Sequence, residues 1–183
     1  MPRHSAVLTI LVALAVAGCG STGKPSSSAT TGTSAGTPTR VTSAAAPPAG
    51  ATTARFIAAA DSICRALRSQ QQPLNARAQA LTQETASARA QLQALLQQSV
   101  VYARAADAKL QALPRPPGET AAIEKLLAGY DHEATEVSSF ADILTKQEPE
   151  KQRSVLGSLE RSTATDRALA KSLGLKVCAA SSE

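Results

Sequence analysis

The chain has 183 residues, a net charge of +5 and an aromatic content of only 2%, with no tryptophan. Arg3, Lys24 and Arg40 lie before Ala54, so residues 54–183 hold 16 basic and 14 acidic side chains. This small excess is not the clustered basic face of a nucleic-acid-binding protein, and the shortage of aromatic rings argues against carbohydrate and nucleic-acid recognition.

Residues 1–18 have the layout of a bacterial lipoprotein signal peptide. Arg3 precedes an apolar run from Ala6 to Val16. Small residues then lead to Cys19. The run is much shorter than the roughly 20 apolar residues of a membrane-spanning helix, and an ordinary secretory signal needs no cysteine at its cleavage site. We therefore predict cleavage after residue 18, lipid attachment to Cys19, and a location on the outer face of the cell membrane.

The next segment, residues 20–53, is almost entirely Gly, Ser, Thr, Ala and Pro. Such a composition buries too little apolar surface to offset the entropy lost on ordering. We therefore predict that residues 19–53 form a disordered tether that carries the lipid. The folded domain is expected at residues 54–183, a size typical of a single domain.

Helical periodicity dominates the predicted domain from its start. Apolar side chains recur at steps of three and four residues from Phe56 to Leu67, which indicates one buried stripe on a first helix. Pro73 is expected to end or kink this helix, because proline lacks the backbone N–H that a helix interior requires.

A second apolar stripe runs from Leu81 to Leu113, and the proline-rich segment 114–118 ends it. Residues 79–98 of this helix are rich in glutamine. We predict that they form its solvated side, and the alternative is a coiled-coil-like surface for another helix.

The third and fourth helices complete the predicted fold. The stripe from Ile123 to Leu144 alternates steps of four and three residues. Pro149 suits the first position of a fourth helix, and Gly174 suits its C-terminal end. Because short connections make successive helices antiparallel, we predict an all-α fold, an up-down four-helix bundle. Many stripe positions are Ala or Ser, so the core is expected to be thin.

Two cysteines remain once Cys19 is assigned to lipid. Cys64 lies in the first predicted helix, and Cys178 follows the end of the fourth. In an up-down bundle these two parts of the chain are neighbours, and disulfides persist in exported proteins. We therefore predict a Cys64–Cys178 disulfide that stabilises the thin core.

The two ends of the domain resemble those of a broad group of actinobacterial lipoproteins. The resemblance rests on residues 56–64 (FIAAADSIC) and 173–178 (LGLKVC), together with the order of signal, tether and helical domain. It implies a lipid anchor, a low-complexity tether and cysteines near both ends of a helical domain. It implies no chemical activity.

One histidine, His132, lies in the predicted domain among acidic residues. Helical spacing places it on the same face as Glu136. A solvated polar surface is the main interpretation, and a weak surface metal site is the alternative. The clustered acidic residues are expected on exposed faces, and we predict no catalytic residue, no resident metal and no cofactor.

Tyr102 and Tyr130 fall on the core stripes of neighbouring helices. They are expected either to pack together or, with Leu95 and Val137, to line a cavity. The leading hypothesis is a non-enzymatic interaction or structural module of the cell envelope, with another envelope protein as its partner. The alternative is a carrier of a small apolar or lipid ligand between the helices. A filled or open space at these four residues distinguishes the two hypotheses.

Overall fold

The structure is a computed structural model that describes residues 49–146 and 148–180. The predicted signal peptide, the lipidation site Cys19 and the predicted tether up to residue 48 lie outside these residues. In the two described segments the chain is helical and has no strand. No helix in this part of the chain is both long enough and apolar enough to cross a membrane.

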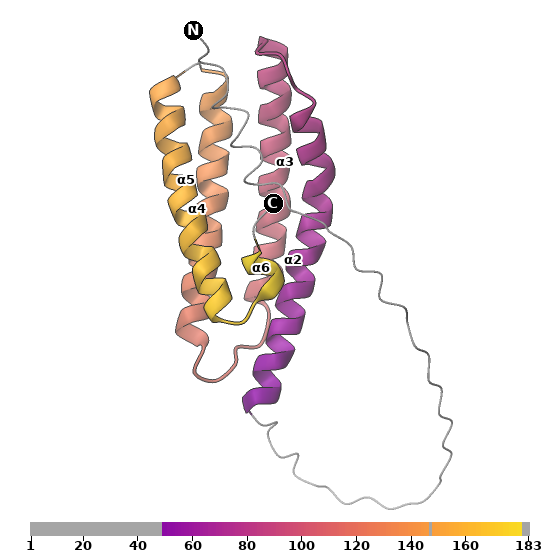
Figure 1. Ribbon diagram of the computed structural model, residues 1–183, viewed down its shortest axis with the longest axis vertical. Coiled ribbons are helices and arrows are strands. Elements are labelled where there is room, and N and C mark those ends of the chain that lie inside the picture. The colour runs from indigo at the N-terminus through magenta and orange to yellow at the C-terminus, as the bar shows by residue number, and fades with distance from the viewer. Residues whose placement is uncertain (1–48, 147, 181–183) are drawn as a thin grey trace, which may run out of the picture.

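Within the described residues 49–146 and 148–180, four long helices form the bundle, and a short helix follows them. They are α2 (Ala49–Gln79), α3 (Ala86–Gln111), α4 (Thr120–Leu144), α5 (Pro149–Ser172) and α6 (Lys176–Ala179). Successive long helices run in opposite directions, and α6 lies between α2 and α5 near one end of the bundle (Figure 1). The predicted all-α antiparallel bundle is confirmed.

The first helix differs from its prediction at both ends. It begins at Ala49, before the predicted boundary at Ala54, and it continues through Pro73 to Gln79. Leu74 and Ala78, beyond the proline, are buried in contact with α3. We attribute the continuation to this packing, which compensates for the hydrogen bond that a proline removes from a helix.

The turn between α2 and α3 consequently lies later in the chain than Pro73 suggests. Thr85 ends this turn, and its hydroxyl accepts a hydrogen bond from the Ala88 N–H at 3.1 Å. This contact is an N-terminal cap, which satisfies one of the free donors of the first helical turn. Leu81 therefore lies in the turn and not on the stripe of α3.

The core is divided along the bundle. At the end that contains α6, all four long helices contribute to one cluster, which includes Ile123 and Leu175, each no more than 2% exposed. Toward the other end, α3, α4 and α5 share a second cluster, whose residues include Val100, Val137 and Leu156. There α2 packs through a separate, smaller cluster with α3. The bundle is therefore tightest at its α6 end.

Gly174 turns the chain from α5 into α6. Its φ of 78° is in the left-handed region, where glycine carries no steric penalty. The Leu175 N–H donates to the Ala170 carbonyl and the Gly174 N–H donates to the Lys171 carbonyl, both at 3.0 Å. These are the two hydrogen bonds of a Schellman motif. The predicted helix end is confirmed, and the turn directs Leu175 into the core.

Candidate functional site

A disulfide joins the first long helix to the last short one. Cys64 of α2 and Cys178 of α6 are bonded across a sequence separation of 114 residues, with their Cα atoms 5.3 Å apart. The predicted pairing is confirmed. The bond holds α6 against α2 at the end of the bundle where the core is tightest.

Asp61, one helical turn before Cys64, binds the N-terminal end of α6. Its carboxylate accepts hydrogen bonds from the backbone N–H groups of Lys176, Val177 and Cys178, at 3.2, 2.8 and 3.3 Å. A helix of four residues has no internal acceptors for its first backbone N–H groups. The buried Asp61 carboxylate accepts hydrogen bonds from these groups instead.

Arg68, one helical turn after Cys64, binds the other end of α6. Its guanidinium Nη2 donates to the carbonyl oxygens of Val177 and Ala180, the latter at 3.1 Å. Asp61, the disulfide and Arg68 together with α6 form a unit that we call the clasp. Sequence reasoning identified its two cysteines and missed both charged residues, although their spacing places them on the same face of α2 as Cys64.

A groove of about 300 Å³ lies between α2 and α5. The long helices pack in chain order, α2 with α3, α3 with α4 and α4 with α5, while α6 bridges α2 and α5. The clasp residues Cys64, Arg68, Val177 and Cys178 line the groove. The volume is at the lower limit of typical ligand pockets.

Much of the groove lining is aliphatic and comes from several helices. These side chains are Leu67, Val100, Ala103, Ala106, Leu110, Ala134, Val137, Leu156, Leu159 and Val177. The core clusters at the two ends of the bundle leave the groove open. The side chains around it therefore present an apolar surface to the groove.

The predicted cavity residues divide into two pairs. Tyr130 and Val137 line the groove, whereas Leu95 and Tyr102 do not. Leu95 is buried against Leu74 of α2, and Tyr102 packs against the same cluster. The prediction was wrong for this second pair because the stripe of one helix does not show which of several neighbours each residue faces.

Two carboxyl groups, Glu133 of α4 and Asp166 of α5, meet beside the groove. Asp166 is only 6% exposed, and its carboxylate lies against the backbone at Gly129, where a Cβ atom would overlap it. The two groups share a hydrogen bond, and the Thr163 side chain also hydrogen-bonds to Glu133. Glycine at position 129 therefore makes the room that the Asp166 carboxylate occupies.

Burial and mutual repulsion control the ionisation of the pair. Burial, followed by the charge of Asp166, raises the pKa of Glu133 to about 7. Burial also raises the pKa of Asp166. Glu133 therefore keeps its proton through the weakly acidic pH range, because ionising it would place a second negative charge beside Asp166.

The expectation that the clustered acidic residues lie on exposed faces is wrong. Glu133 is partly buried and Glu136 is buried, as are Asp61, Asp107 and Asp166 on the other helices. The buried face of α4 is wider than the narrow stripe of apolar residues that the sequence predicts. It therefore also includes polar residues that lie beside the apolar ones.

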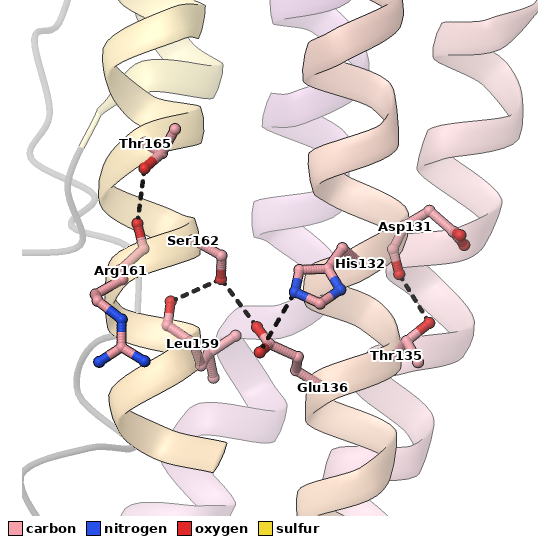
Figure 2. A network of polar contacts seen from close by, with 8 residues as sticks. All are labelled: Asp131, His132, Thr135, Glu136, Leu159, Arg161, Ser162 and Thr165. Atoms are coloured by element: carbon pink, nitrogen blue, oxygen red, sulfur yellow. Dashed lines mark hydrogen bonds and ion pairs between the residues drawn. The ribbon is translucent and has the colours of Figure 1, made fainter. Parts of the chain in front are cut away.

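His132 is on the outside of the bundle, as its position off the core stripe predicts. Its side chain is 61% exposed, and its Nε2 atom lies 3.4 Å from Glu136 Oε1. Figure 2 shows Glu136 between His132 of α4 and Ser162 of α5, whose hydroxyl donates to Glu136 Oε2 at 2.9 Å. This polar contact links α4 to α5. Among the residues that the structure describes, no three His, Cys, Asp or Glu side chains are arranged to hold a metal ion.

Comparisons with known proteins identify no relative of this chain. No protein-family model, no curated protein and no solved structure matches it. The interpretation of the groove therefore depends on its own geometry and chemistry.

Proposed function

We propose that the helical domain is a non-enzymatic carrier that holds a small, largely apolar molecule in the groove between α2 and α5. The observation that supports this function is the groove itself, which has a volume of about 300 Å³ and a largely aliphatic lining. Apolar surface in a concave site is the usual basis of small-molecule binding.

The groove favours a carrier over a purely structural module. Tyr130 and Val137, which pack at the edges of the two larger core clusters, also line the groove between them. A volume of about 300 Å³ equals roughly ten times the 30 Å³ that one water molecule occupies in the liquid. A ligand with about ten non-hydrogen atoms therefore matches the space.

A binding experiment with an uncharged ligand tests the carrier function. The full chain carrying Cys19→Ser, exported to an oxidising compartment so that the disulfide forms, is titrated with octan-1-ol by calorimetry. We expect saturable binding at one site. Ala103→Phe places a ring in the groove and should abolish binding, whereas Ala108→Phe, on the exposed side of the same helix, should not. Absence of binding, or equal binding by both variants, would contradict the proposal.

We further propose that the carrier is a cell-envelope lipoprotein of the actinobacterial group, anchored by lipid on Cys19 at the outer face of the membrane. The signal-like N-terminus supports this location, and so does the Cys64–Cys178 disulfide, since such bonds persist in exported proteins. Cys19→Ala should move the protein from the membrane fraction to the soluble fraction. Full retention in the membrane fraction would contradict the lipid anchor.

A further inference from the structure

The polar part of the groove contains carboxylate oxygens that no protein donor satisfies. Asp166 Oδ2 and Glu133 Oε1 are buried and accept no hydrogen bond from any backbone or side-chain donor. Both residues line the groove. A buried carboxylate oxygen without a donor is costly, so its hydrogen bond has to come from a proton that the pair shares or from a bound molecule.

The cationic side chains of the groove are already engaged. Arg68 donates to the carbonyls at the end of α6 and is part of the clasp. Arg167 also has an interaction of its own. The unsatisfied atoms in this part of the groove are thus carboxyl oxygens, which favours a ligand that brings hydrogen-bond donors and positive charge.

The aliphatic lining extends from this carboxyl pair along the groove. Val137, Leu156 and Leu159 lie on α4 and α5 beyond Glu133 and are partly or fully buried. A molecule in the groove would therefore have a polar end at the pair and an apolar remainder along these residues. An ammonium group offers three N–H donors in place of the single shared proton.

We propose that the groove binds a small amphiphilic amine, with its ammonium group on Asp166 and Glu133 and its alkyl part among the aliphatic side chains of α3, α4 and α5. This assignment rests on the carrier function proposed above and specifies its ligand. It also explains why two carboxyl groups are buried here, since the packing of α4 on α5 does not by itself require them.

Three ligands with the same alkyl chain and different head groups test the assignment. The full chain carrying Cys19→Ser is titrated with octylamine, octan-1-ol and octanoate at pH 7.5, where an alkyl ammonium group is charged. We expect octylamine to bind at least tenfold more tightly than octan-1-ol, the typical effect of a charged hydrogen bond, and octanoate to bind most weakly. Asp166→Asn should weaken octylamine binding and remove its advantage over octan-1-ol.

Two further variants keep the result interpretable. Glu133→Gln removes the second carboxylate and should also reduce octylamine binding. Thermal unfolding shows whether each variant is folded, so Glu133→Gln still tests the assignment if Asp166→Asn does not fold. Asp142→Asn, on the exposed side of α4, is the matched control and should bind as the parent does. If octylamine and octan-1-ol bind equally, the amine assignment is wrong and the carrier function stands. If none of the three ligands binds, the carrier function itself is wrong.

Discussion

At the scale of single residues, Gly129 of α4 allows the acidic residue Asp166 to be buried inside the bundle, beside Glu133. Gly129 of α4 has no side chain, and the carboxylate of Asp166 occupies the space that a Cβ atom would fill. Glu133, one helical turn further along α4, hydrogen-bonds to Asp166, and the pKa of each group is raised by burial. The pair contacts the groove and links α4 to α5, so small changes at these positions should affect both stability and binding.

Gly129→Ala should destabilise the protein even though alanine is the better helix former. The gain in helix propensity is about 1 kcal/mol, but overlap with the Asp166 carboxylate should cost about 1–3 kcal/mol. We expect a net loss in the free energy of unfolding, measured by urea denaturation.

Gly157→Ala is the matched control for this substitution. Its Cβ would meet only Arg161 Nη1, at an ordinary 3.5 Å, so the protein should gain about 0.5–1 kcal/mol. A Gly129→Ala protein as stable as the Gly157→Ala protein would show that Asp166 does not occupy this space.

Glu133 should make the protein less stable as the pH rises. Its pKa is raised from 4.5 to about 7 in the folded state, so the folded protein binds more protons than the unfolded chain between these values. Stability is therefore greatest below about pH 4.5 for this group and falls by about 3 kcal/mol as the pH rises to about 7.

Urea denaturation at pH 5, 6, 7 and 8 measures this effect. Glu133→Gln should flatten the pH dependence, because glutamine does not titrate. Glu124→Gln, on the exposed side of the same helix, should keep the parental slope. Equal slopes for the parent and Glu133→Gln would rule out a shared proton on Glu133.

At the scale of elements, the four-residue helix α6 depends on α2. A helix of this length is not stable alone, because few of its backbone groups are paired within it. Asp61 satisfies its donors, Arg68 satisfies its acceptors, and the disulfide covalently fixes its middle. These contacts place α6 between α2 and α5, where it bridges the two helices that flank the groove.

Asp61→Ala should loosen α6 while the disulfide remains intact. Loss of a capping carboxylate typically costs about 1–2 kcal/mol, which corresponds to roughly five- to thirtyfold faster local opening. Hydrogen exchange of the Val177 and Cys178 amides, both donors to Asp61, measures this directly. Asp142→Ala is the exposed control, and unchanged exchange in Asp61→Ala would contradict the capping role.

At the scale of the whole molecule, the groove exists because the four helices pack together at one end of the bundle but not at the other. All four long helices share one core cluster at the α6 end, whereas toward the other end α2 packs with α3 alone. The clasp fastens the first helix to the last segment of the described chain across a separation of 114 residues. It therefore holds α2 in place at one end without filling the groove.

The double variant Cys64→Ser/Cys178→Ser should lose much of the stability of the bundle. Cross-linking residues this far apart stabilises a protein by about 4–5 kcal/mol in the chain-entropy model, which is an upper value. Urea denaturation without reductant should show this loss, and the parent protein with reductant should approach the stability of the variant. If the disulfide-free protein is as stable as the parent, the clasp does not fasten the bundle.

Sequence patterns predicted the elements well because they depend on local chemistry. The apolar stripes indicated helices, the proline at 149 and the glycine at 174 marked the boundaries of α5, and the antiparallel order followed from short connections. Cys64 and Cys178 were paired correctly because an up-down bundle brings the two ends of the domain together. Pro73 does not end α2, since the buried contacts beyond it continue the helix.

The sequence by itself therefore determined the helices, their antiparallel order and the disulfide, because each depends on local periodicity, on chain connectivity or on the few cysteines available. Only the tertiary structure decided which helix each residue faces. It buried Asp166 against Gly129 and beside Glu133, placed Leu95 and Tyr102 outside the groove, and opened that groove between α2 and α5. These features depend on the rotation of each helix against several neighbours at once, which the periodicity of one helix does not specify.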